Sequence, residues 1–161
     1  MTQNGELLLG EFTRALDERY RLSIPSELAE PLAADGPDCI LVKQQAGCLS
    51  LFAAAAWKKR HDGNLRLLQA KLEEGRLDGR MHDVQQLGRL LSTRHKPIQL
   101  AGRGRLVIPD GFRQFLGVEA GGEMIIVGAA VCVELWNPTH WLEHLEVQIP
   151  SYRELFETLA N

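Results

Sequence analysis

The sequence predicts an α+β fold made of two similar β-rich units, with helices between them and after them. The first observation is an internal repeat, because residues 16–57 and 100–141 align at an offset of 84 with 11 identities over 42 positions. The second is short apolar runs bounded by turn residues, which are typical of antiparallel hairpins. The third is a set of long segments with apolar residues at helical spacing. Two copies are too few for a solenoid, so we expect a pseudo-symmetric pair with one shared core.

The repeat is most distinct where LDERYRLSIP at residues 16–25 returns as LAGRGRLVIP at residues 100–109. Six of these ten positions are identical. Further along, rare residues fall in register at the same offset without a gap: Cys48 with Cys132, and Trp57 with Trp141. Matches between rare residues make a chance origin of the repeat improbable.

Each unit is expected to run strand, charged loop, short strand, short helix and hairpin. The alternation in the short strand places Leu22 and Ile24 on the core face and Arg21 away from it. In the first unit the expected elements are a strand at 7–15, the loop DERYR, a strand ended by Pro25, a helix capped by Ser26, and a hairpin of CILVK and CLSLF. In the second they are RLVIP, a helix ending at Gly117, and a hairpin of MIIVG and VCVELW.

The middle segment, roughly 53–95, and the end of the chain are expected to be helical. Gly63 is expected to divide the first helical stretch, and Ser151 to cap the last one. The resulting division is a first unit at 7–57, a helical connection at 58–95, a second unit at 96–141 and a helical tail at 142–161.

Composition and charge exclude several classes of protein. The net charge of −3 argues against a generally basic nucleic-acid binder, but residues 1–109 carry +3 and residues 110–161 carry −6. No apolar run is long enough to span a membrane, and no signal peptide is evident, so we expect a cytoplasmic protein. Three cysteines without CxxC spacing indicate neither a disulfide framework nor a zinc site. We expect Cys48 and Cys132 to be small buried residues.

Candidate enzymatic motifs are weak. His140 and His144 would share one side of a helix, but the HExxH pattern is absent and a surface pair is the simpler interpretation. The GRGR run at 102–105 lacks the lysine and the following Ser or Thr of a phosphate-binding loop. We therefore expect no catalysis, no metal and no cofactor.

The loops before the two short strands are the better candidate site. Each carries two arginines at i and i+2, which would share one face of an extended run: Arg19 with Arg21, and Arg103 with Arg105. The planar guanidinium suits phosphate groups and guanine edges. In the first loop these arginines could instead pair with Asp17 and Glu18, whereas the second loop has no acid and has Gly102 and Gly104 to let it bend.

At this level of detail the chain resembles the MraZ family, within the AbrB/SpoVT class of swapped-hairpin transcription factors. LDERYRLSIP looks like the family's D-x-x-x-R loop and strand, LAGRGRLVIP matches its second copy, and residues 125–128, 133–136 and 141 resemble the closing hairpin. Asp17 and Arg21 match the ends of the first motif, and Arg105 matches the second arginine. Ala101 stands where the second motif has aspartate, and Tyr20 where the first has glycine.

The resemblance implies interleaved hairpins that form a shared small β-barrel, and subunits that associate into a ring. It also implies a repressor, located in the cytoplasm and on the nucleoid, that binds direct repeats of double-stranded DNA before the division and cell-wall gene cluster, including its own operon. We expect Tyr20 either to stack on a sugar or base or to pack under its loop. An alternative function is an oligomeric scaffold that binds proteins and has weak or no DNA binding.

Two sets of residues follow from the loops and from the basic run at 94–105. The residues expected to contact DNA are Arg14, Arg19, Arg21, Arg94, Lys96, Arg103 and Arg105. Those expected to support the loops are Asp17, Tyr20, Gly102 and Gly104.

Overall fold

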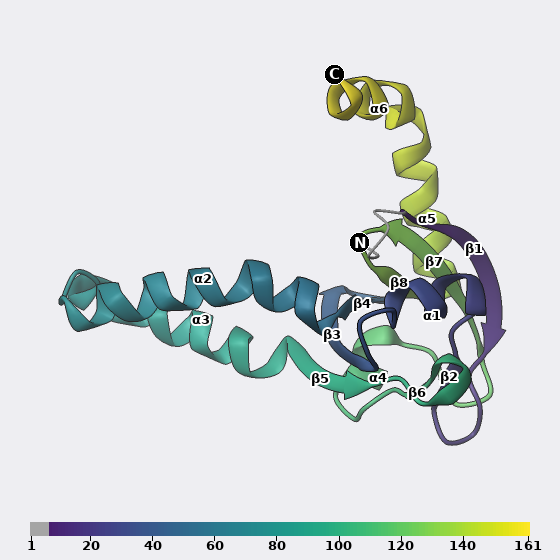
Figure 1. The fold of residues 1–161 in the computed structure, drawn as a ribbon, viewed down its shortest axis with the longest axis horizontal. Helices are drawn as coiled ribbons and strands as arrows, with labels where there is room; N and C mark the ends of the chain where they lie inside the picture. The colour runs from purple at the N-terminus through teal and green to yellow at the C-terminus, as the bar shows by residue number, and fades with distance from the viewer. Residues whose placement is uncertain (1–6) are drawn as a thin grey trace.

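The structure, a computed structural model, describes residues 7–161. It has the expected α+β class, with one six-stranded antiparallel sheet in the order β1-β7-β8-β4-β3-β5 and a two-stranded sheet of β2 and β6 (Figure 1). The strands are β1 (Leu8–Ala15), β2 (Arg21–Ser23), β3 (Asp38–Gln45), β4 (Cys48–Ala53), β5 (His95–Gln99), β6 (Arg105–Val107), β7 (Glu123–Ala130) and β8 (Val133–Trp136).

The helices fall into two groups. Two short ones cover the β-rich body, while α2 and α3 form a long arm and α5 and α6 project from another side of the body (Figure 1). The α-helices are α1 (Ser26–Leu32), α2 (Ala54–Glu73), α3 (Met81–Thr93), α4 (Phe112–Leu116), α5 (Pro138–Gln148) and α6 (Tyr152–Ala160). None of the four projecting helices has a buried residue. Within residues 7–161, no helix combines the length and apolar character that crossing a bilayer needs.

The two units exchange strands. β1 of the first unit pairs with β7 of the second, from Leu8 opposite Ala130 to Ala15 opposite Glu123. β5 of the second unit pairs with β3 of the first, and β2 pairs with β6. Neither unit therefore completes its hydrogen bonding with its own residues alone, and the pair is one structural body.

The sequence alignment of the two copies has no gap, but the structural alignment of their hairpins requires a gap of one residue. Leu41 lies opposite Leu51, and Ile126 lies opposite Leu135. The offset is therefore 84 in β4 and β8 but 85 in β3 and β7. A bulge in the first hairpin, where the register shifts between Lys43 and Gln45, accommodates the difference.

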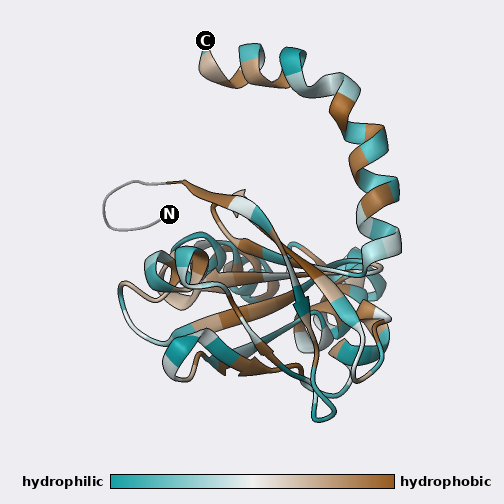
Figure 2. Ribbon diagram, turned by 90° about the vertical axis from the view of Figure 1, so that its right-hand side faces the viewer, coloured by the Kyte–Doolittle hydropathy of each residue, from teal (hydrophilic) through white to brown (hydrophobic). Residues whose placement is uncertain are grey.

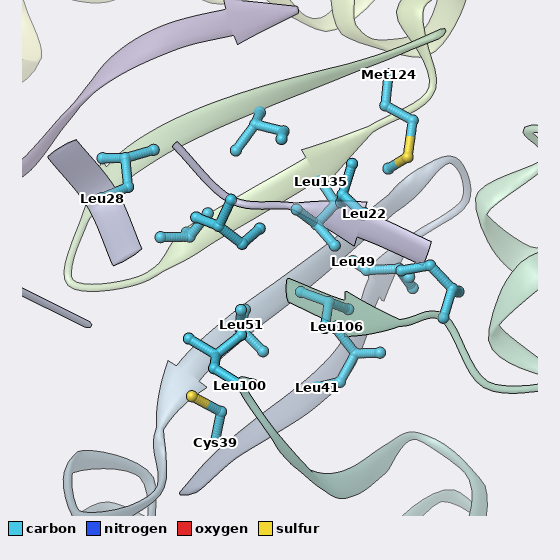
Figure 3. Close-up of a cluster of buried hydrophobic side chains, with 14 of the residues drawn as sticks. Leu22, Leu28, Cys39, Leu41, Leu49, Leu51, Leu100, Leu106, Met124 and Leu135 are labelled. Atoms are coloured by element: carbon cyan, nitrogen blue, oxygen red, sulfur yellow. The ribbon is translucent and has the colours of Figure 1, made fainter. Parts of the chain in front are cut away.

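The core lies between the two sheets. Leu22 and Leu106 face each other across β2 and β6, and both are buried beside leucines of the large sheet, including Leu49 and Leu51 (Figure 3). Arg21 and Arg105, which lie next to these leucines along the chain, are exposed. The alternation predicted for the short strands is thus confirmed, and it turns the arginines outward.

The opposite face of the large sheet carries the expected buried cysteines and two equivalent aromatic pairs. Cys48 is fully buried and Cys132 nearly so, and burial raises the pKa of the Cys132 thiol to about 12. Where each hairpin passes into its helix, an aromatic residue of the strand packs on a tryptophan five residues later: Phe52 on Trp57 and Trp136 on Trp141, with ring centroids 5.1 and 5.3 Å apart.

Three local predictions were wrong. α2 runs through Gly63 without a break, because a single glycine costs a helix only about 1 kcal/mol. The chain turns instead near Gly75, which has a φ of 72°. Ser26 is the first residue inside α1, and its hydroxyl donates to Glu27 instead of capping the helix. Ser151 likewise makes no side-chain cap for α6.

Candidate nucleic-acid interface

Three of the predicted arginines meet in one depression on the body. Because β2 and β6 are antiparallel, Arg105 lies opposite Ser23, one diagonal step from Arg21. Arg14, near the end of β1, lines the same depression as Arg21 and Arg105. Residues from both units therefore build one cationic surface.

The two loops are locked to each other by main-chain hydrogen bonds. The amide of Ile24 donates to the carbonyl of Gly104, and the amide of Ile108 donates to that of Tyr20, both at 2.9 Å. Tyr20 and Gly104 occupy equivalent positions and are both left-handed, with φ of 60° and 70°. Neither loop is therefore an extended run, the condition under which the two arginines of one loop would share a face. Arg103, also left-handed, lines a different depression beside α1.

Asp17 holds the first loop together. One carboxylate oxygen accepts the amides of Arg19 and Arg21, both at 2.8 Å, and the other accepts Nε of Arg21 at 2.7 Å. These bonds, that of the Arg21 amide above all, hold the pKa of Asp17 below its ordinary value of 3.8. Because the folded pKa is lowered, the stabilisation is complete above pH 3.8 and is lost as the pH falls through the lowered value. The pairing considered for the first loop is therefore present, with Asp17 as the partner of Arg21.

The second loop has the same backbone but not the carboxylate. The amide of Ala101 donates to the carbonyl of Arg105 at 2.8 Å, as that of Asp17 does to Arg21 at 3.0 Å. Nε of Arg105 donates to the carbonyl of Gly102 at 3.2 Å, and within residues 7–161 neither arginine of this loop forms an ion pair. Its cationic charge is thus available to a ligand.

Beneath the loops, equivalent positions of the two units carry side-chain pairs of different size. Tyr20 packs with Arg113 on one side, and Gly104 packs with Ala29 on the other. The guanidinium of Arg113 lies 4.2 Å from the centre of the Tyr20 ring, and donates to the carbonyl of Ile108 at 2.6 Å. At the equivalent positions, a Cβ on Gly104 would approach the Cβ of Ala29 to 2.7 Å. Tyr20 is half-buried and packs under its loop, the second of the two roles expected for it. Sequence reasoning did not include Arg113 among the residues that support the loops. The feature that could have identified it is its alignment with Ala29 at the offset of 84.

The remaining predicted residues lie elsewhere. Arg94 ends α3 and donates to the carbonyl of Lys43 at 3.2 Å, and Lys96 lies on β5 opposite Leu41, so both are at the base of the arm. Arg19 is exposed next to Tyr20. Across the part of the chain that the structure describes, no cluster of three or more His, Cys, Asp or Glu side chains could hold a metal.

Known proteins of one family are similar in sequence to this chain. The family model described as "MraZ protein, putative antitoxin-like" matches residues 96–159. Proteins named "Transcriptional regulator MraZ" align over nearly the full length: that of Syntrophomonas wolfei is 27% identical over 96% of this chain and 98% of its own, and that of Heliobacterium modesticaldum is 28% identical over the same shares. That of Treponema denticola is 29% identical, again over 96% and 98%.

Over nearly its full length, this chain is similar to proteins named as members of the MraZ family. The resemblance seen in the two loops is thereby confirmed. The relatives are named as transcriptional regulators, which is the class that the sequence predicted in place of an enzyme.

The second loop can be given the aspartate that the first loop has, because Ala101 stands at the position equivalent to Asp17. Ala101→Asp is expected to raise the Tm by about 2–4 °C, since the new carboxylate would accept the amides of Arg103 and Arg105 as Asp17 does in the first loop. Thermal unfolding followed by circular dichroism measures it. Ala101→Asn is the matched control, and should gain less because it brings no charge to Arg105. A Tm of Ala101→Asp at or below the wild-type value would contradict this account.

Proposed function

We propose that this MraZ-family regulator acts by binding double-stranded promoter DNA through its two arginine loops. The observation that carries the proposal is the single depression lined by Arg14, Arg21 and Arg105, to which both units contribute. Guanidinium groups fit phosphates and the guanine edge, and their charge is concentrated here although the chain is acidic overall. A local basic surface is sufficient for a polyanionic partner.

The arginines differ in their proposed roles. Arg21 and Arg105 face the depression from the paired strands and bind both a base edge and an adjacent phosphate, while Arg14, Arg19 and Arg103 contact further phosphates. Arg94 and Lys96, at the base of the arm, contribute more distant phosphate contacts. Asp17 and Tyr20 position the first loop, and Gly102 and Gly104 shape the second.

We also propose that copies of the chain assemble into a ring, because a single pair of loops is a small binding surface. Repeated loops on direct DNA repeats would raise affinity through effective concentration. The proposed output is repression of the division and cell-wall gene cluster, including the protein's own operon, by a protein in the cytoplasm and on the nucleoid. Within each copy, the units at 7–57 and 96–141 would form the shared barrel, with 58–95 as the connection and 142–161 as the tail.

An electrophoretic mobility-shift titration on the protein's own promoter region, repeated at several salt concentrations, tests the DNA-binding proposal. The double variant Arg21→Ala/Arg105→Ala is expected to lose at least tenfold in affinity and to show a flatter salt dependence, since each phosphate contact contributes about 0.9 to the log–log slope. Unchanged affinity and slope would refute the site. A stoichiometric protein partner after nuclease treatment, with no DNA retained, would favour the scaffold function instead.

A further inference from the structure

The outward face of the β2–β6 pair consists of four side chains. The middle leucine of each strand is buried, so the residues on either side of it point away from the core. Arg21 lies opposite Val107, and Ser23 lies opposite Arg105. All four are exposed, next to the hydrophilic loop that joins β1 to β2 and protrudes from the body (Figure 2). The two arginines thus occupy one diagonal of a square, and Ser23 and Val107 occupy the other.

The internal repeat makes one diagonal of this square symmetric and the other asymmetric. At the offset of 84, Arg21 corresponds to Arg105, whereas Ser23 corresponds to Val107. A hydroxyl therefore stands opposite one arginine and an isopropyl group opposite the other. Val107 is 49% exposed, although the other three residues of the face are polar. A single exposed apolar residue is ordinary on a protein surface, but this one lies beside an arginine that is proposed to bind a base.

The two edge strands of the large sheet differ in the same sense. Arg14 of β1 lies opposite Met124, and Ile98 of β5 lies opposite Cys39. Met124 and Cys39 correspond at the offset of 85 that relates β7 to β3, so Arg14 and Ile98 hold equivalent positions. Arg14 is exposed and lines the depression with Ser23, whereas Ile98 is uncharged and packs on the core. The hydroxyl and the additional cationic charge therefore lie in the same depression, and their counterparts are both apolar.

We propose that Ser23 and Val107 give the DNA sequence that this chain reads a fixed direction. Val107 contacts the methyl group of a thymine in the base pair next to the one that Arg21 binds. The Ser23 hydroxyl forms a hydrogen bond with the base pair next to that of Arg105. Side chains opposite each other on paired strands lie about 5 Å apart, and base pairs follow one another at about 3.4 Å, so neighbouring base pairs are within reach. This assignment rests on the proposed DNA binding and names its specificity.

The chemistry of the major groove supports these two roles. The groove admits a two-stranded ribbon, and the thymine methyl is the apolar group that base pairs present there. A face that obeyed the two-fold symmetry of the repeat would favour a palindrome. Because only the arginines obey it, the bound segment has two different ends, with a thymine at the Val107 end and an additional phosphate contact from Arg14 at the Ser23 end. Repeats that run in one direction would therefore orient every copy in the same way.

Replacing single thymines by deoxyuridine tests the contact of Val107, because uracil lacks only the methyl group. The probe is the segment of the protein's own promoter region that footprinting shows to be bound, and fluorescence anisotropy measures the dissociation constant. At one thymine of a repeat, the replacement is expected to weaken binding by the wild type about three- to fivefold, the effect of one buried methyl group. Val107→Ser is expected to bind both probes equally. Ser23→Val, the matched control at the equivalent position, should keep the difference at that thymine.

Val107→Ile retains a methyl group at the contact and should also keep the difference, and circular dichroism verifies that each variant is folded. A folded Val107→Ser variant that still distinguishes the two probes, or that binds neither, would overturn the proposal. So would a wild type that binds the promoter but loses no affinity at any thymine, and the Arg21→Ala/Arg105→Ala result would then still support the loops. A wild type that does not bind the promoter would refute the DNA-binding function itself, and the roles of Ser23 and Val107 with it.

Discussion

Arg105→Ala is expected to weaken binding to promoter DNA by about ten- to a hundredfold, and by more than Arg21→Ala, since one guanidinium that reads a base is worth about 1–3 kcal/mol. The charge of Arg21 is already shared with Asp17 at 2.7 Å, whereas Arg105 donates only to the carbonyl of Gly102. DNA therefore gains more from Arg105. Fluorescence anisotropy with labelled promoter DNA measures both dissociation constants.

The comparison needs one control for charge and one for folding. Arg76→Ala removes the same charge from the turn of the arm, away from the loops, and should leave the dissociation constant nearly unchanged. Thermal melts should show that Arg105→Ala is folded, because the lost side chain is exposed and donates a single hydrogen bond, at 3.2 Å, to the carbonyl of Gly102. An equal or larger loss for Arg21→Ala would mean that Asp17 presents Arg21 to DNA instead of competing for it.

Gly128→Val is expected to lower the free energy of unfolding by about 3 kcal/mol, the upper part of the range for overpacked sites. Gly128 lies in β7 opposite Gly10 of β1, and a Cβ there would come within 2.6 Å of the backbone of Leu8 and Leu9. The side chain would push the exchanged strand away from its partner. Urea unfolding measures the change.

Gly88→Ala is the matched control for that substitution. Gly88 lies inside α3, where a Cβ meets nothing within 4 Å, and alanine should raise stability by about 0.5–1 kcal/mol through helix propensity. A lower free energy of unfolding for Gly128→Val and a higher one for Gly88→Ala would show that the loss at Gly128 comes from the close approach of the strands and not from replacing a glycine as such. A Gly128→Val variant as stable as the wild type would show that β1 can leave β7 without cost.

The order of the strands and helices could be predicted from the sequence, because each of these elements has its own local pattern of apolar and turn residues. β2 and β6, at an offset of 84, begin at Arg21 and Arg105 as the repeat predicted, and α2 and α5 begin at the same offset. The exchange of strands was implied by the family resemblance and by no local pattern, since β1 could equally have paired within its own unit. Pairing over such a separation is decided by the shared core.

The geometry of the two arginine loops could be predicted less well than the order of the elements. Tyr20 is left-handed, a conformation that a large aromatic residue rarely adopts, and the sequence alone did not indicate it. That conformation is held by contacts from the other unit, including Arg113 and the amide of Ile108. Sequence spacing grouped the arginines within each loop, whereas the fold brings Arg21 of one loop and Arg105 of the other to one depression.

The strand exchange also determines when the protein can fold during its synthesis. β1 occupies Leu8–Ala15, but its partner β7 occupies Glu123–Ala130, more than a hundred residues later. At about 5–20 residues per second, a ribosome would need roughly 5–20 s to make that partner after β1. Throughout that interval the nascent first unit exposes both edges of β1 unpaired, together with the apolar residues meant for the shared core. Translation speed and nascent-chain chaperones should therefore affect the yield of this protein more than that of a chain whose neighbouring strands pair in order.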